Sequence, residues 1–262
     1  SKKKPNLKPW FKTKNIILKS KEEINISVIG KYVDLKDAYK SIDEALVHGG
    51  IANNLKVNID KIDSENLTKA NLKNKLFKTN GILIPGGFGK RGTEGKLNSI
   101  KFARLNKIPF FGICFGMQLS LIEFAINVLK IKNAGSTEIN KKCVPVIGLI
   151  EEWYKDGILK KGDLKKIGGT MRLGKYECNL LEKTLIRQIY KSNKVFERHR
   201  HRYEVNIKYR EKFEQKGLIF SGLSNNNKLP ETIELKSHPW FIGVQFHPEF
   251  KSRPLNPHPL FA

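Results

Sequence analysis

The chain has 262 residues, enough for one substantial hydrophobic core or two small domains, and its basic start SKKKPNLKPW lacks the apolar segment of a secretory signal. Three scattered cysteines are too few for a disulfide framework or a metal cluster, so we expect no metal and a reducing, cytoplasmic setting. The net charge of +24 would suit a nucleic-acid partner, but the lysines are spread through nearly every segment, which favours a solvated lysine-rich surface.

The first half of the chain alternates strand-like and helix-like segments. Residues 1–23 have no sustained period and are expected to be a tail or linker. The alternation that follows predicts a parallel sheet with helices on both faces. In chain order we expect a strand INISVIG, a helix over 35–48 ending at Gly49-Gly50, a strand LKVNIDKI, a helix over 65–77, a strand GILI, a helix over 96–106 and a strand IPFFGI.

The stretch FFGICFGMQLSLIEFAINVL, residues 110–129, is long and apolar enough to suggest a membrane span of about 20 residues. Gln118, Glu123 and Asn127 argue against that reading, because polar side chains are costly in hydrocarbon. A helix beginning near Phe115 would instead collect its polar residues in one stripe. The stretch is therefore predicted to be a strand, a sharp turn and an amphipathic helix, and no membrane partner is expected.

Beyond Asn133 the pattern changes to short strand-like runs, without a repeat or a strong domain boundary. We expect these runs to add mixed or antiparallel strands to the same sheet, so that residues 24–262 form one α/β domain. The runs are VPVIGLI, LKKIGGTMRLG, KVFERH, GLIFSGL, TIELK and FIGVQF.

The motif Gly-Ile-Cys-Phe-Gly, residues 112–116, resembles a nucleophile elbow, in which a strand–turn–helix lifts a reactive side chain above the sheet. Cys114 would lie at a helix N-terminus, where the helix dipole favours the thiolate, and the Phe115 amide would point into the same space. The alternative is a buried, inert cysteine. If the strands GILI and IPFF are neighbours, the loop Pro-Gly-Gly-Phe-Gly faces the same crevice and offers unshielded amides to an anion.

A reactive thiolate needs a base, and His247 in the run FIGVQFHPEF is the candidate among six histidines. Glu249 follows two positions later, so extended geometry would place both side chains on one face. The carboxylate would then orient the imidazole, although a surface His–Glu pair is an equal alternative for this tripeptide alone. The dense basic cluster ERHRHRYEVN is either an anion clamp or a nucleic-acid patch, and alternation would split it into two faces.

These motifs, in this order, resemble the triad-type glutamine amidotransferases. The blocks GKYVDLKDAYKSIDEAL, STE at 136–138, GGTMRLG, ERHRHRYEVN and QFHPEF resemble more narrowly the C-terminal glutaminase domains of CTP synthases, and the likeness extends from Asn25 to Ala262. It implies a flavodoxin-like, mostly parallel sheet with additional antiparallel strands. Position 115 is commonly Leu in that family and is Phe here, which a role of the backbone alone would tolerate.

The resemblance also implies the roles of individual residues. Cys114 would attack the side-chain amide of L-glutamine to form a thioester and release ammonia, with His247 as base and acid and Glu249 orienting it. The amides of Gly87 and Phe115 would hold the oxyanion. Further substrate-binding residues would be Gly116, Met117 and Gln118, with Glu138 on the α-ammonium group and Arg202 on the α-carboxylate.

For the whole protein the resemblance implies an N-terminal synthase domain that aminates UTP with ATP and Mg²⁺, joined to this chain through the linker over 1–23. No cofactor is expected in the glutaminase domain itself. GTP would be an allosteric effector, with Arg91 in the loop GKRGTEG as a candidate contact, and the full protein would be a homotetramer.

Two rival functions remain open at the level of sequence. One is a thiol hydrolase of the same fold, such as a γ-glutamyl peptide hydrolase, against which Glu138 and Arg202 argue. The other is a basic nucleic-acid-binding protein with decayed motifs, which would bind in a strongly salt-dependent manner. The intact Cys, His and Glu argue against decay, so nucleic acid is not the expected partner.

Overall fold

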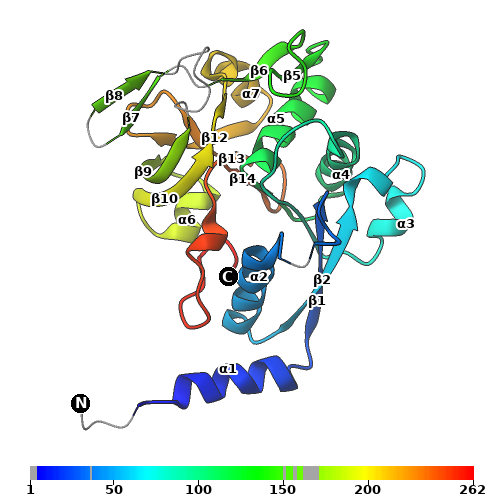
Figure 1. Cartoon of the computed structure of the whole chain (residues 1–262), viewed down its shortest axis with the longest axis vertical. Coiled ribbons are helices and arrows are strands. Elements are labelled where there is room, and N and C mark those ends of the chain that lie inside the picture. The colour runs from blue at the N-terminus through cyan, green and yellow to red at the C-terminus, as the bar shows by residue number, and fades with distance from the viewer. Residues whose placement is uncertain (1–4, 36, 150–151, 156–157, 162–170) are drawn as a thin grey trace.

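A nine-stranded sheet organises the chain in the computed structural model, which describes residues 5–35, 37–149, 152–155, 158–161 and 171–262 (Figure 1). Its strand order is β10-β9-β12-β13-β14-β4-β3-β1-β2. The five strands from β14 to β2 run parallel, and each pair from β14 back to β10 is antiparallel. The strands are β1 (Glu23–Gly30), β2 (Lys56–Asp63), β3 (Gly81–Ile84), β4 (Phe110–Ile113), β9 (Arg172–Leu180), β10 (Lys194–His201), β12 (Leu218–Ser224), β13 (Pro230–Leu235) and β14 (Phe241–Val244).

This arrangement confirms the predicted mixed α/β sheet and the adjacency of β3 and β4. The run VPVIGLI was wrongly placed, because it forms a separate three-stranded sheet in the order β11-β6-β5. Part of the predicted strand LKKIGGTMRLG lies outside the described residues, and its end forms the start of β9. The smaller sheets contain β5 (Ala134–Ser136), β6 (Val144–Leu149) and β11 (Tyr203–Val205), and a hairpin of β7 (Glu152–Lys155) with β8 (Ile158–Lys161).

Alternation along the buried strands gives each face of the sheet its own apolar cluster. Ile82 and Ile84 of β3 pack with the helices α4 and α5, whereas Leu83 between them packs on the opposite face with α2 and the C-terminal Leu260. Helices therefore cover both faces, as the alternating pattern predicted. The helical segments are α1 (Lys8–Lys19), α2 (Lys40–Ala52), η1 (Ser64–Asn66), α3 (Leu72–Leu76), α4 (Thr93–Asn106), α5 (Phe115–Asn127), α6 (Leu185–Tyr190), η3 (Ile207–Tyr209), α7 (Arg210–Gln215) and η4 (Pro248–Phe250).

Three helix predictions differ from the structure at their bounds, and the helix expected over 96–106 already starts at Thr93. The helix expected over 35–48 starts only at Lys40 and continues through Gly49 and Gly50, which pack against the backbone of Phe261 and Leu55. A β-carbon at Gly49 would lie 1.8 Å from the Phe261 carbonyl oxygen, so these glycines allow close packing and are no helix stop. The helix expected over 65–77 is reduced to η1 and the short α3.

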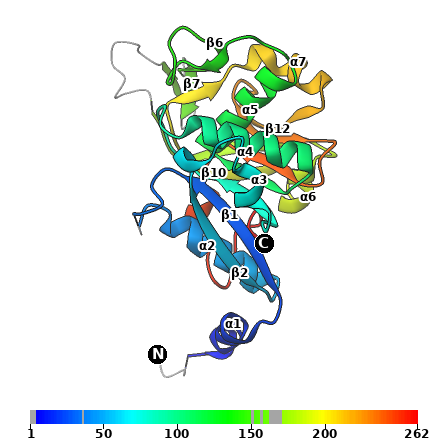
Figure 2. The ribbon, with the colours of Figure 1, turned by 90° about the vertical axis from the view of Figure 1, so that its right-hand side faces the viewer.

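The N-terminal residues 8–19, expected to be an irregular tail or linker, form the helix α1. This helix lies at one end of the molecule, apart from the sheet (Figure 2). Only Thr13 of α1 is buried, and its large apolar side chains Trp10, Phe11 and Leu18 are more than half exposed.

The helix α5 was expected to be amphipathic, and that prediction is wrong. Ser120 and Glu123 of the polar stripe are buried, and α4 packs against α5. Arg104 of α4 donates two hydrogen bonds to the Glu123 carboxylate, at 2.8 and 2.7 Å. Among the described residues, no helix is long and apolar enough to cross a bilayer.

Candidate active site

The loops that follow β3, β4 and β14 meet at the carboxyl edge of the parallel strands, where α/β sheets bind ligands. They enclose a cavity of ≈ 490 Å³ that Gly86, Gly87, Cys114 and His247 all line. The sequence places the glycine loop, the cysteine and the histidine far apart, and the sheet brings them together. The other lining residues are Tyr32, Ala38, Tyr39, Phe88, Gln118, Glu138, Met171, Arg200, His201, Arg202 and Tyr203.

Cys114 has the strained backbone of a nucleophile elbow, with φ 51° and ψ −100° immediately before α5. The two flanking glycines are required by close backbone packing. A β-carbon on Gly112 would lie 2.7 Å from the Gly116 carbonyl carbon, and one on Gly116 would lie 2.2 Å from the Ile84 carbonyl oxygen. The Cys114 amide also donates to the Val244 carbonyl at 2.6 Å, which ties the turn to β14.

His247 contacts Glu249 as expected, with Nδ1 2.8 Å from the carboxylate Oε1. The expected extended geometry is wrong, however, because Glu249 lies in the 3-10 turn η4, which brings the carboxylate back to the ring. The His247 backbone amide donates to the Arg198 carbonyl at 2.8 Å, and its ring stacks on Phe250. The imidazole is therefore held from several sides.

The environment of His247 favours its charged form. Burial alone would lower the pKa of this imidazole, but the charge of Cys114, hydrogen bonding with that sulfur and the Glu249 carboxylate together raise the pKa to about 10. The sulfur of Cys114 also accepts a hydrogen bond from the side-chain amide of Gln245 at 3.5 Å.

Gly86 is a site residue that the sequence reasoning missed. A β-carbon there would lie 2.7 Å from Cε1 of the His247 ring and 3.7 Å from Cβ of Cys114. No local pattern could distinguish it from Gly87, because the close approach involves segments distant in the sequence. A β-carbon on Gly87 would instead lie in ordinary contact with the side chains of Phe115 and Lys96, at 3.7 and 3.9 Å.

Glu138 and Arg202, the two residues expected to bind a zwitterion, both line the cavity. Glu138 accepts a hydrogen bond from the Gly89 amide at 3.1 Å. Burial raises the pKa of the Glu138 carboxyl, although the Gly89 amide and the cations Lys31 and Arg202 act in the opposite direction. A cavity with the Glu138 carboxylate and arginine guanidinium groups on its wall suits an amino acid.

The basic cluster ERHRHRYEVN splits into two faces, as alternation predicted, with His199 and His201 buried and Arg198 and Arg200 more exposed. Behind it, the buried Arg172 guanidinium joins Glu204 at 2.8 Å and Glu231 at 2.7 Å. This ionic clamp connects three strands, β9, β11 and β13, at the back of the cavity wall.

The segment after the nucleophile is less exposed to the cavity than expected. Gln118 lines it and donates to the Tyr203 carbonyl at 2.8 Å and to Gln245 at 3.0 Å. The side chains of Phe115 and Met117 lie in the core, and Gly116 packs on β3. These three residues can therefore face the cavity only with their backbone.

Arg91 lies beside the cavity, next to the lining residue Tyr32. Its guanidinium is 5.2 Å from the centre of the Tyr32 ring, pairs with Glu65 at 3.1 Å and donates to the Lys31 carbonyl. Phe88 of the glycine loop is 63% exposed close by, with the Lys31 ammonium 4.5 Å from the ring centre. The group forms a cationic and aromatic rim.

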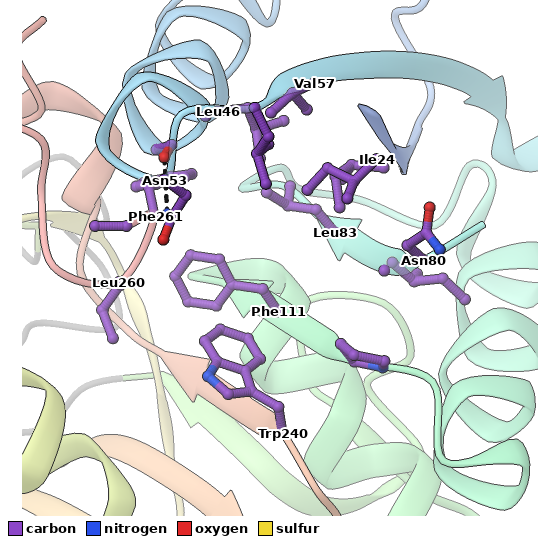
Figure 3. Close-up of a pocket in the computed structure, with 18 residues that line it drawn as sticks. Ile24, Leu46, Asn53, Val57, Asn80, Leu83, Phe111, Trp240, Leu260 and Phe261 are labelled. Atoms are coloured by element: carbon purple, nitrogen blue, oxygen red, sulfur yellow. Dashed lines mark hydrogen bonds between the residues drawn. The ribbon is translucent and has the colours of Figure 1, made fainter. Parts of the chain in front are cut away.

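A second cavity, of ≈ 440 Å³, opens at the opposite edge of the sheet (Figure 3). Phe111 and Trp240 lie on one side of it, and Leu46 of α2 and Leu260 line it further round. It lies at the amino ends of the parallel strands, and none of the described residues that line it has an ionisable side chain. Neither its place nor its chemistry fits a catalytic centre.

Comparison with known proteins identifies the family of the chain. The family model described as "Glutamine amidotransferase class-I" matches residues 34–262. A CTP synthase of Pelagibacter ubique is 65% identical over 262 residues, covering 100% of this chain and 49% of that protein. A CTP synthase of Rhizobium johnstonii is 54% identical, covering 99% and 48%. The solved Trypanosoma brucei CTPS glutaminase domain with bound acivicin superposes with a TM-score of 0.81 at 36% identity, covering 91% of this chain and 90% of that one.

Proposed function

The chain belongs to the class-I glutamine amidotransferases, and within them to the glutaminase domains of CTP synthases, and from this premise we propose that it hydrolyses the side-chain amide of glutamine through a thioester on Cys114. The observation that carries the proposal is the contact of Cys114, His247 and Glu249 at the edge of one cavity. It favours a cysteine nucleophile over a buried, inert thiol.

The proposed reaction has two halves. The Cys114 sulfur attacks the amide carbonyl carbon, and the imidazolium of His247 gives a proton to the leaving nitrogen, so that the C–N bond breaks and ammonia departs. A water molecule then gives its proton to the neutral His247 imidazole and attacks the thioester carbonyl, which releases glutamate and returns the sulfur as thiolate. Glu249 holds Nδ1 of the ring so that Nε2 is directed at the sulfur and the substrate.

Negative charge develops on the carbonyl oxygen in both halves. We assign its stabilisation to the backbone amides of Gly87 and Phe115, one on each side of the nucleophile. Phe115 begins α5, so the positive end of the helix dipole adds to the same field. Because this role uses only the backbone, Phe in place of the common Leu leaves it unchanged.

Free glutamine is the proposed substrate because its two backbone charges have partners of opposite sign. Glu138 is assigned to the α-ammonium and Arg202 to the α-carboxylate, both on the cavity wall. Gln118 borders the same space, and Gly116 and Met117 contribute backbone only. At an internal residue of a poly-γ-glutamyl chain the α-nitrogen is acylated and uncharged, so Glu138 would have no cationic partner there.

The chain spans about half the length of the curated relatives it matches. For the whole protein we propose that the ammonia is passed to a synthase domain that converts UTP to CTP with ATP and Mg²⁺ in a cytoplasmic homotetramer.

GTP is proposed as effector at the rim formed by Lys31, Tyr32, Phe88 and Arg91, because aromatic rings and cations suit a base and its phosphates. Arg91→Ala is expected to raise the GTP concentration needed for half-maximal activation.

The proposal is tested by ammonia release from glutamine and by labelling with a γ-electrophilic glutamine analogue. We expect Cys114→Ala to abolish release and the analogue to label Cys114 alone, as mapped by mass spectrometry. Cys178 is a matched control, because it is also buried but lies outside the cavity, and burial raises the pKa of its thiol well above the usual range. Labelling at Cys143 or Cys178, or activity retained in Cys114→Ala, would overturn the assignment.

A further inference from the structure

A lysine lies buried directly behind the two residues assigned to the oxyanion. Lys96, in the first turns of α4, is only 1% exposed. Its Nζ is 5.4 Å from the centre of the Phe115 ring and 3.9 Å from the point that a Gly87 β-carbon would occupy. The ammonium group therefore lies close to both residues whose amides are assigned to the oxyanion, on their protein side.

This cation has no close counter-charge. Within the described part of the chain its ammonium group forms no hydrogen bond or ion pair, and its one specific contact is with the Phe115 ring. Two cations, Lys31 and Arg91, disfavour the charged form of Lys96, and the Asp63 carboxylate favours it. Glu65 of the neighbouring turn η1 is paired with Arg91. A buried charge in such surroundings costs folding free energy, which indicates a role outside stability.

We propose that Lys96 is a positioning residue for catalysis, whose positive charge strengthens the oxyanion hole formed by the Gly87 and Phe115 amides. Its field acts through the protein interior, where the low dielectric makes a fixed charge act strongly. Lys96 never touches the substrate, and it donates no proton in the reaction. The inference rests on the proposed glutamine hydrolysis and adds a residue that the motifs of the sequence did not reveal.

The proposal has a consequence for the pH dependence of the reaction. Burial lowers the pKa of Lys96 to about 8, helped by Lys31 and Arg91 and opposed by Asp63. Because kcat/KM reports the ionisation of the free enzyme, it should fall as pH rises through about 8 and the charge is lost. The His247 imidazolium titrates at about 10, so the two ionisations are separable.

The test compares Lys96→Met, which keeps the length of the side chain without its charge, with the wild-type chain in glutamine hydrolysis. We expect kcat/KM at pH 7 to fall on the order of tenfold to hundredfold, less than for the loss of an oxyanion donor itself. The loss near pH 8 should be missing in Lys96→Met. In Lys96→Arg, which stays charged at higher pH, the activity should be largely retained and its decline shifted to higher pH.

Alkylation of Cys114 by iodoacetamide is the control reaction, because it uses the thiolate but forms no oxyanion. We expect Lys96→Met to alkylate at the wild-type rate. A parallel fall in alkylation and hydrolysis would overturn the assignment to the oxyanion, and wild-type kcat/KM with the loss near pH 8 still present would overturn any role. If either of these results is obtained while Cys114→Ala is inactive, the role of Lys96 is refuted but glutamine hydrolysis is not. If Cys114→Ala is active, the proposed glutamine hydrolysis itself is refuted.

Folding of the variant has its own readout. The unfolded chain binds the Lys96 proton with the usual pKa of 10.5, so the burial penalty is complete below about pH 8 and disappears above 10.5. Lys96→Met should therefore melt at a higher temperature than the wild type at pH 7, and the difference should close toward pH 10.5. A less stable variant at pH 7 would show that the charge has a structural partner, contrary to the proposal.

Discussion

At the scale of single residues, the site requires a glycine at position 86, where no side chain fits. Gly86 leaves room for the His247 ring, since a β-carbon there would lie 2.7 Å from Cε1. We expect Gly86→Ala to displace the imidazole and lower kcat by about a hundredfold, because a misplacement near 1 Å costs that much. Steady-state glutaminase kinetics measure it.

Gly148 in β6 provides the matched control for that substitution. A β-carbon there would meet nothing within 4 Å, and its φ is not positive. Gly148→Ala should keep wild-type kcat and KM. Equal activity in both variants would mean that the ring moves aside without consequence.

The charge state of His247 gives a second residue-scale prediction. Its pKa is raised to about 10 by the Cys114 charge and the contact with Glu249, against the effect of burial. Removing either partner in Cys114→Ala or Glu249→Gln should lower the titration midpoint by about one unit or more, measured by NMR of labelled histidine. His238 serves as internal control, because burial lowers its pKa and the Ala103 carbonyl binds its ring, far from the cavity. An unshifted His247 midpoint would contradict the proposed triad.

At the scale of elements, α5 shows where periodicity predicts well and where it fails. The helix starts at Phe115, as the apolar spacing predicted, but its polar stripe faces α4 instead of water. The same pattern of polar residues suits a solvated face and a buried ion pair. Only the partner helix decides between them, and Arg104 of that helix is distant in the sequence.

The buried pair makes a stability prediction. Arg104→Ala would leave the Glu123 carboxylate, 1% exposed on its side chain, without a partner. We expect a loss of about 3–5 kcal/mol in the free energy of unfolding, measured by urea denaturation. The double variant Arg104→Met with Glu123→Leu should recover most of it, because two apolar side chains leave no charge buried. If the double variant is no more stable than Arg104→Ala, the loss comes from packing and not from the unpaired charge.

The end of β14 illustrates the same division. The run FIGVQF predicted a strand, which is confirmed as β14, and His247 after it lines the cavity. The contact with Glu249 arises through the turn η4, which no alternation pattern could indicate. Proline after His247 favours such a turn, so a local signal existed in Pro248.

At the scale of the whole molecule, the dominant feature is the net charge of +24. Self-repulsion among so many cations opposes the compact state, and salt screens it over about 10 Å at 0.1 M. We expect the melting temperature to rise by roughly 3 °C or more between about 10 and 200 mM NaCl, followed by circular dichroism. An unchanged or falling melting temperature would show that repulsion between the lysines does not destabilise the folded chain.

The sequence by itself determined the strands of the parallel half, the turn at Cys114 and the candidates His247 and Glu249, because apolar spacing and residue chemistry are local properties. The tertiary structure alone decided that Gly86 abuts the imidazole and that Lys96 lies uncompensated behind the glycine loop. Burial and proximity depend on segments far apart along the chain, and a linear pattern carries no record of which of them will pack together.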